Sequence, residues 1–228
     1  MTSSNTSLAI VAALAGMAMA APALAQTDAA PRPGIAAGDV LLRVRTILVA
    51  PNETSGSVLP AFPGERVRVN NSVMPEVDVT YMATNNIGFE LIAATTKHHA
   101  DGRTGTTGSI GKLASTWVLP PTLTAQYHLN PAGKVRPYVG AGLNYTIFWN
   151  EKASDGLIAA VGPTDVHMKD SFGWAAQAGV DIDITPKVFL NLDVKYIDID
   201  TTARLRTTAA GTAARWVEPY RVRKRARV

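Results

Sequence analysis

Residues 172–184 read FGWAAQAGVDIDI and alternate strictly between two classes of side chain. The even positions, beginning with Phe172 and Trp174, are all apolar, whereas the odd positions are small or polar and include Asp181 and Asp183. Successive side chains of a β-strand point to opposite faces. The stretch therefore predicts one long strand with an apolar face and a polar face.

The same period-two pattern recurs along the chain and predicts further strands. The seven predicted strands are residues 40–48, 73–83, 87–96, 119–129, 135–149, 172–184 and 188–196. An eighth strand is expected near residues 213–222. Several are long for a soluble sheet but suit tilted membrane strands of ~9–11 residues plus extensions.

The connections between the predicted strands alternate in length. The short links are residues 85–86, 130–134 and 185–187, and the long ones are residues 51–72, 97–117, 150–171 and 201–212. Short periplasmic turns alternating with long outer loops are typical of outer-membrane barrels. The sequence thus predicts an all-β fold, an eight-stranded antiparallel transmembrane up-and-down β-barrel with short periplasmic turns and long extracellular loops.

The N-terminal segment predicts export. Residues 8–20 are small and apolar, and Ala23-Leu24-Ala25 provides a cleavage signal, so residues 1–25 are expected to be a cleaved signal peptide. The first seven residues carry no Lys or Arg, and a retained anchor is the alternative. Residues 26–38 are expected to form a flexible leader, residues 39–222 the barrel and residues 223–228 an atypical basic tail.

Composition agrees with a barrel and excludes several kinds of site. The mean hydropathy is only +0.06, as expected where polar lumen-facing residues alternate with apolar lipid-facing ones. The absence of cysteine excludes disulfides and thiolate metal sites. The net charge of +4 comes from the last eight residues, which hold five of the 22 Lys and Arg residues.

The polar faces of the predicted strands carry charges of both signs. The expected lumen-lining residues are Arg43, Arg45, Glu76, Asp78, Glu90, Arg136, Asp181, Asp183, Asp193 and Lys195. They could form ion pairs that plug the lumen, or line a wet channel; eight strands leave an interior just wide enough for side chains. On the apolar faces, an aromatic girdle is expected from Tyr81, Tyr127, Tyr145, Trp149, Trp174 and Tyr196.

A soluble β-sandwich or lipocalin-like barrel would also alternate, with its apolar side inward. Periodicity alone does not tell inside from outside. Charge on the polar faces, strand length, loop asymmetry and the export signal together favour the membrane barrel.

Several stretches resemble the outer-membrane protein W family, in family order, from residue 37 to about residue 220. They are residues 37–39, 81–91, 119–127, 136–146, 169–173, 179–181 and 196–203. The resemblance implies a small barrel with a narrow lumen that passes small, often hydrophobic, molecules, embedded in lipid by the barrel-assembly machinery. It also implies an apolar constriction at Ile92 and Phe172. Alternation agrees for Ile92 but puts Phe172 on the outward face, so either a bulge intervenes or that assignment is wrong.

The chain departs from the family at its end. Where the family continues with an apolar strand ending in an aromatic residue, this chain reads RVRKRARV from Arg221. A frameshifted or truncated gene would give such an ending, and an authentic basic tail is the alternative. Basic residues at the lipid midplane cost ~2–4 kcal/mol each, which puts closure of the eighth strand in question.

Nothing in the sequence indicates catalysis or a cofactor. His98, His99 and Asp101 lack a spaced further ligand, and we expect no metal site there. The residues 140–142, Gly-Ala-Gly, lie in a predicted strand and not before a helix, so they are no dinucleotide motif. No Ser/His/Asp arrangement stands out, and the basic tail lacks the interleaved aromatics of a nucleic-acid interface.

We therefore expect a narrow outer-membrane pore for small hydrophobic molecules; a structural or adhesive barrel whose loops bind partners is the alternative.

Overall fold

The computed structural model describes residues 16–21, 34–55, 65–207, 215–216 and 220–227. Its strands are β1 (Gly16–Ala21), β2 (Val40–Ser55), β3 (Val67–Val69), β4 (Ser72–Met82), β5 (Ile87–Ala94), β6 (Thr96–Gly102), β7 (Lys112–Leu119), β8 (Thr122–His128), β9 (Val135–Ala153), β10 (Thr164–Met168), β11 (Ser171–Thr185), β12 (Val188–Thr207), β13 (Arg215–Trp216) and β14 (Tyr220–Arg227). Two short helices are α1 (Gly105–Ile110) and α2 (Asp155–Val161). None of the helices in these ranges has the length and hydropathy needed to cross a bilayer.

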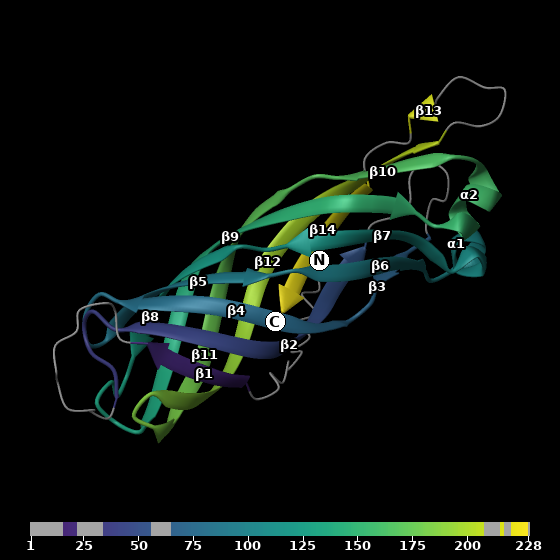
Figure 1. The fold of residues 1–228 in the computed structure, drawn as a ribbon. Helices are drawn as coiled ribbons and strands as arrows, with labels where there is room; N and C mark the ends of the chain where they lie inside the picture. Colours follow the sequence, from purple (N-terminus) through teal and green to yellow (C-terminus); the bar gives the residue numbers. More distant parts are fainter. Residues whose placement is uncertain (1–15, 22–33, 56–64, 208–214, 217–219, 228) are drawn as a thin grey trace, which may run out of the picture.

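The strands close into an antiparallel barrel (Figure 1). Its ring of hydrogen-bonded neighbours runs β2, β4, β5, β8, β9, β11, β12, β14 and back to β2. The shorter strands prolong members of this ring: β3 leads into β4, β6 follows β5, β7 leads into β8, and β10 leads into β11. The eight-stranded up-and-down barrel predicted from the sequence is confirmed.

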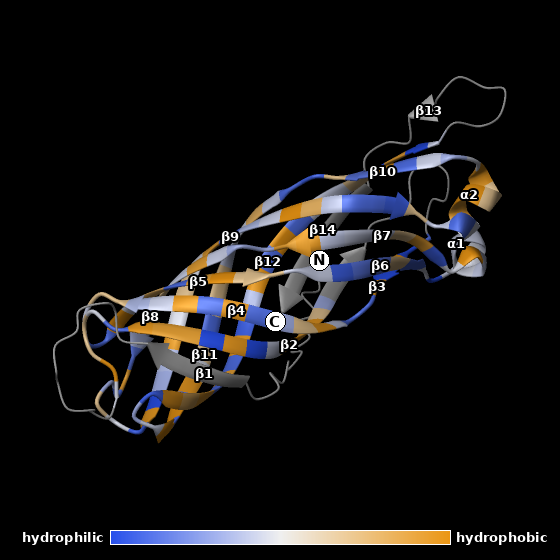
Figure 2. Ribbon diagram, viewed as in Figure 1, coloured by the Kyte–Doolittle hydropathy of each residue, from blue (hydrophilic) through white to orange (hydrophobic). Residues whose placement is uncertain are grey.

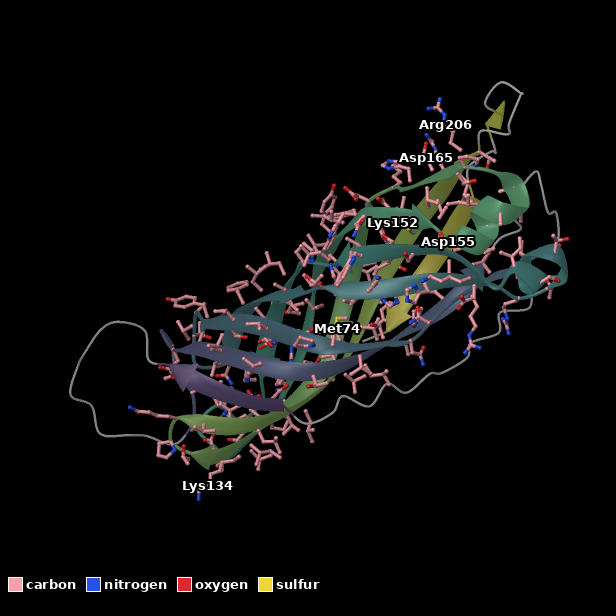
Figure 3. All side chains as sticks on the ribbon, turned by 45° about the vertical axis from the view of Figure 1, so that its right-hand side comes forward. Met74, Lys134, Lys152, Asp155, Asp165 and Arg206 are labelled. Atoms are coloured by element: carbon pink, nitrogen blue, oxygen red, sulfur yellow. The ribbon has the colours of Figure 1, made fainter. Side chains whose placement is uncertain are left out.

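The long outer connections are themselves largely strand. Residues 97–117, expected to form a loop, hold most of β6, α1 and most of β7, and residues 150–171 hold α2 and β10. Figure 1 shows both helices at one end of the barrel, with the short turns at the other. Figure 3 shows Lys152, Asp155, Asp165 and Arg206 near the helical end and Lys134 at the turn end. Loop asymmetry identifies the helical end as the outer one.

The last strand lies further along the chain than expected. β14 spans Tyr220–Arg227, so the basic run from Arg221 forms the strand and does not follow it. It pairs with Tyr196–Ala203 of β12 and Ala50–Ser55 of β2, beyond the exposed Leu192 and Val194 of β12. The basic strand therefore lies above the apolar belt, where the midplane penalty does not apply.

The turn end of the same seam is closed by a different segment. β1, which the sequence assigns to the export signal, pairs with Val188–Asn191 of β12 and Val40–Arg43 of β2. It runs antiparallel to both, in the same direction as β14. The eighth position of the barrel is thus filled in two parts, by β14 on the outer side and by β1 on the periplasmic side. Cleavage of the signal peptide stays a prediction.

The hydropathy of the ribbon alternates along the strands (Figure 2). In β4 and β5 each residue is buried or exposed in strict turn, with Val77, Val79 and Leu91 among the exposed ones. The polar alternate residues are buried inside the barrel, which is the inverse of a soluble sandwich. This arrangement identifies the outer surface as the lipid-facing one.

Candidate functional site: an ionic plug below an apolar pocket

Arg43 lies at the centre of the lumen and its guanidinium reaches strands on both sides. Its Nη1 donates to Asp78 Oδ1 at 3.1 Å and Thr80 Oγ1 at 2.6 Å, while Nη2 donates to Asp181 Oδ2 at 3.1 Å. The side chains of Arg43, Asp78 and Asp181 are 0% exposed. A buried arginine is tolerated only where carboxylates and hydrogen bonds replace its water, and Arg43 has both.

Arg45 and Lys195 continue this ion-pair cluster toward the outer end. Arg45 Nη2 lies 2.5 Å from Glu76 Oε1 and 2.8 Å from Asp78 Oδ2. Lys195 Nζ lies 3.7 Å from Glu90 Oε2, 3.8 Å from Asp193 Oδ1 and 3.9 Å from Glu76 Oε1. The sequence could not decide between a wet channel and a plug; the structure shows a plug.

Neutral polar groups tie the plug together. Tyr138 donates from its hydroxyl to Asp193 Oδ2 at 2.8 Å and accepts from Asn191 Nδ2 at 3.0 Å. Its ring lies against the Arg43 guanidinium, 5.5 Å from the ring centre. Gly179 leaves room for that ring, because a Cβ added there would lie 2.5 Å from the Tyr138 hydroxyl. Glu90 accepts from Gln177 at 2.7 Å and from Thr124 at 3.0 Å.

The plug rests on an apolar layer at the periplasmic end. Ile35, Leu41, Met82 and Phe189 form this layer, all at most 6% exposed. At the rim, Arg136 pairs with Asp183, whose side chain is 13% exposed, and its guanidinium lies over the Phe189 ring at 5.4 Å. All ten residues expected to line the lumen therefore lie in or beside the plug.

An apolar pocket lies on the outer side of the plug. The empty space in and above it is about 630 Å³, which includes the solvent at its open mouth. Its wall includes Ile47, Val49, Ile92, Val118, Phe148 and Ile197, with Glu76 at the plug. Ile92, expected from the family resemblance at an apolar constriction, is 3% exposed and lies in this wall.

The wall of the pocket has a break in its hydrogen-bond ladder. Strand pairing stops at Ile92 with Thr122 and resumes at Thr96 with Val118, so residues 93–95 and 119–121 form no ladder pairs with each other. Pro120 and Pro121 cannot donate a backbone hydrogen bond. The Pro120 carbonyl accepts from Thr122 Oγ1 at 2.9 Å, within its own segment. Ala94, Thr96, Val118 and Pro120 all line the pocket, so the break opens beside it.

The assignment of Phe172 to the constriction is wrong. Phe172 is 69% exposed on the outer surface of β11, where it pairs with Tyr145 of β9. No bulge shifts the register between these two strands, which runs unbroken from Ser171 to Ile182. The alternation of β11 therefore prevails over the family resemblance, and Phe172 lies among the exposed aromatics.

The residues expected to form the aromatic girdle lie on the outer surface. Tyr81, Tyr127, Tyr145 and Trp174 are about half exposed. Trp149 and Tyr196 are partly exposed; Trp149 stacks on Trp117 at 6.4 Å, and Tyr196 lies against Trp174 at 4.8 Å. Tyr81 and Tyr127 lie toward the periplasmic turns, whereas Tyr145 and Trp174 lie in the outer half.

The residues His98, His99 and Asp101 lie in β6 and not at the start of a loop. His98 Nδ1 contacts the Asn70 carbonyl at 3.1 Å, and the His99 amide donates to Asn70 Oδ1 at 2.6 Å. The pKa of His99 is lowered by burial and by the nearby Lys112 and Lys97. Within the described ranges no group of three or more metal-ligating side chains gathers.

Sequence reasoning missed much of the pocket and several members of the plug. Tyr138, Gln177 and Asn191 share the inward alternation of the charged residues, which is the signal that could have found them. Ile197 and Ile199 continue the same inward series on β12 beyond Lys195. Their apolar character hid them, because the polar face was the marker of the lumen.

Known proteins provide an independent comparison. The family model described as OmpW family matches residues 36–220. Outer membrane protein W of Escherichia coli strain K12 is 42% identical over 175 residues, covering 76% of this chain and 79% of that protein. The protein of the same name from Vibrio cholerae is 38% identical over 174 residues, covering 75% and 79%.

A solved structure is similar in fold as well. The crystal structure of the outer membrane protein OprG from Pseudomonas aeruginosa superposes with a TM-score of 0.72 at 29% identity, covering 85% of this chain and 96% of that chain. The family match spans the chain from just before β2 to the first residue of β14.

Proposed function

This chain belongs to the OmpW family of outer-membrane proteins, and from that premise we propose that it is a narrow outer-membrane pore for small, hydrophobic molecules. The observation that supports this most directly is the apolar pocket between the outer end and the plug. A pocket lined by aliphatic and aromatic side chains favours apolar solutes, since binding removes apolar surface from water. The proposal includes no catalytic step.

The plug decides the route such a solute would take. Arg43 and its partners fill the lumen with charges that are 0% exposed, so an apolar solute moving straight to the periplasm would have to break buried ion pairs. Leaving a buried charge unpaired costs several kcal/mol. We infer that the solute enters from the outer end and leaves sideways.

We infer that the break in the ladder next to Pro120 and Pro121 is the exit. Where strands are paired, passage between them would require separating hydrogen-bonded backbones, and unsatisfied backbone groups are costly in lipid. At residues 93–95 and 119–121 there are no ladder bonds to separate. The pocket already reaches this point through Ala94 and Pro120.

Filling the pocket tests the function. Ala94→Trp places a large ring into the pocket from an inward position, whereas Ala93→Trp places the same ring on the outward face of the same strand. In cells without another OmpW-family protein, uptake of a small labelled alkane is expected to fall several-fold with Ala94→Trp and to stay near wild type with Ala93→Trp. Unboiled gel mobility checks that both variants fold. Equal uptake in all three proteins would favour the structural or adhesive alternative.

A further inference from the structure

Glu76 is the charged residue in the lining of the apolar pocket. The residue is 3% exposed, and its Oε1 is held by Arg45 at 2.5 Å, with Lys195 at 3.9 Å. Its second oxygen, Oε2, accepts no hydrogen bond within the described ranges. Oε2 is not among the fully buried side-chain atoms that lack a partner, so it keeps accessible surface where Glu76 lines the pocket. A donor that enters the pocket can therefore reach it.

The other polar side chains of the pocket are already engaged by backbone. Thr96 Oγ1 donates to the Val118 carbonyl at 3.5 Å, and His98 Nδ1 contacts the Asn70 carbonyl at 3.1 Å. Every other lining residue is apolar. The pocket therefore presents a long apolar wall with one carboxylate at its inner end.

The charge behind Glu76 has the same sign as Glu76 itself. In the connected ion pairs of the plug, three cations (Arg43, Arg45 and Lys195) face five carboxylates (Glu76, Asp78, Glu90, Asp181 and Asp193). Carboxylates therefore outnumber cations in the plug. Such a floor attracts a hydrogen-bond donor or a cation and repels an anion.

We propose that the pocket selects amphipathic molecules with one hydrogen-bond donor head, a primary alcohol or a primary amine, on an apolar tail. The head donates to Glu76 Oε2, and the tail lies along Ile47, Ile92, Phe148 and Ile197. This inference rests on the proposed function and narrows its substrate class. Chains of the same length with a carboxylate head are excluded, because their anionic head has no hydrogen to donate to the Glu76 carboxylate and is repelled by it.

A matched eight-carbon series tests the selection in the wild-type protein. Octane, 1-octanol, octylamine and octanoate are titrated into the isotope-labelled protein in lipid nanodiscs, with the isoleucine methyl signals of Ile92 and Ile197 as the readout. Empty nanodiscs correct for partition into lipid. Octylamine and 1-octanol are expected to bind about ten-fold more tightly than octane, with octanoate weakest. Octane or octanoate binding as tightly as the amine would overturn the proposal.

Two variants separate this proposal from the proposed function. Glu76→Gln keeps the shape of the side chain but removes its charge, and it is expected to bring octylamine within about two-fold of octane while octane binding is unchanged. Ile92→Ala removes wall contacts and is expected to weaken all ligands alike. If Ile92→Ala weakens the binding of all four ligands but Glu76→Gln leaves their order of affinity unchanged, the proposed selection for a donor head is wrong. The pocket would still be the binding site for apolar molecules. If no ligand shifts either methyl signal, the proposed function fails with it.

Discussion

Arg43 of β2 and Asp181 of β11 form an ion pair across the lumen, with Nη2 and Oδ2 3.1 Å apart and both side chains 0% exposed. Two ring members, β12 and β14, separate these strands around the barrel wall. The pair therefore braces the barrel across its interior. A contact of this kind couples the stability of the whole barrel to the charges inside it.

Removing the central cation should destabilise the barrel strongly. Arg43→Met leaves Asp181 buried without its cation and Asp78 with Arg45 alone, and we expect a loss of about 3–5 kcal/mol in the free energy of unfolding. Arg136→Met is the matched control, because its partner Asp183 is 13% exposed and can be solvated. Urea unfolding in detergent, followed by gel mobility, measures both variants. Equal losses would show that the central cluster is not held more tightly than the rim.

Opening the plug should raise ion conductance. Tyr138→Ala removes a ring that is 1% exposed and that bonds Asp193 and Asn191. The space left admits water between the charges, so single-channel conductance in a planar bilayer is expected to rise severalfold. Tyr145→Ala removes the same ring from the outer surface, where the residue is 48% exposed, and should leave conductance unchanged. Equal conductance in both variants would contradict the view that the lumen is plugged at Tyr138.

Restoring backbone donors in the wall should close the side exit. The double variant Pro120→Val/Pro121→Val gives the segment between β7 and β8 the amide hydrogens that the prolines lack. Ladder bonds to residues 93–95 can then form, and uptake of a small alkane is expected to fall several-fold while the barrel becomes more resistant to unfolding. Pro137→Val, on β9 at the periplasmic end, is the control and should not change uptake. Unchanged uptake in the double variant would show that the solute does not leave through this break.

The start of α1, at the outer end of the barrel, should lose hydrogen bonds in acid. Glu65 accepts hydrogen bonds from Thr107 and then Thr106, at the start of α1, and these bonds lower its pKa below the usual value. A lowered folded-state pKa means that the stabilisation is present above the ordinary pKa and is lost as the pH falls through the lowered one. The protection of the Thr106 and Thr107 amides, which is their exchange rate relative to the intrinsic rate at the same pH, should therefore be lost at acidic pH. Glu65→Gln should show low protection of these amides at all pH values. A pH dependence of the protection that survives this change would implicate another group.

The periplasmic part of the seam should depend on β1. A refolded chain that starts after Ala25 lacks the partner of Val188–Asn191 and Val40–Arg43, and unpaired backbone is costly in lipid. We expect it to unfold at lower urea than the full chain. Ala18→Pro in the full chain, which removes one amide, should fall between the two. Equal unfolding midpoints for all three would show that β1 contributes nothing to closure.

The strand positions and the inward charges could be predicted from the sequence. A strand with one face toward lipid and the other toward a polar lumen has apolar and polar residues in alternation. In β5, Glu90 is 0% exposed and Leu91 is 56% exposed, as their alternation requires. The pocket could not be predicted by the same signal. At residues 47–49 the sequence is Ile-Leu-Val, so inward Ile47 and Val49 are as apolar as Leu48 between them. Where both faces of a strand are apolar, the alternation of polar and apolar residues is lost, and the inward face cannot be recognised from the sequence.

The outer connections were misjudged for a related reason. Above the lipid both faces of a strand can be polar, as in β6 with its Lys97, His98 and His99, and such a strand reads as a loop. The assignment of Phe172 to the constriction fails for another reason. The alternation of β11 is unbroken from Ser171 to Ile182, and it places Phe172 on the outward face. The ion pairs across the lumen join strands that become neighbours only when the barrel closes. The alternation within a single strand therefore could not predict them.

Pro120 and Pro121 give the pocket wall a property that no rearrangement of the strands can reverse. The missing amide hydrogens are absent from the covalent chain, so these two residues can accept ladder bonds but never donate them, and the ladder beside Ala94 cannot be completed. A slot of this kind needs no trigger and no energy source. Any solute that crosses there moves down its own concentration gradient and as readily backward as forward, so net accumulation would have to come from whatever consumes the solute beyond the membrane.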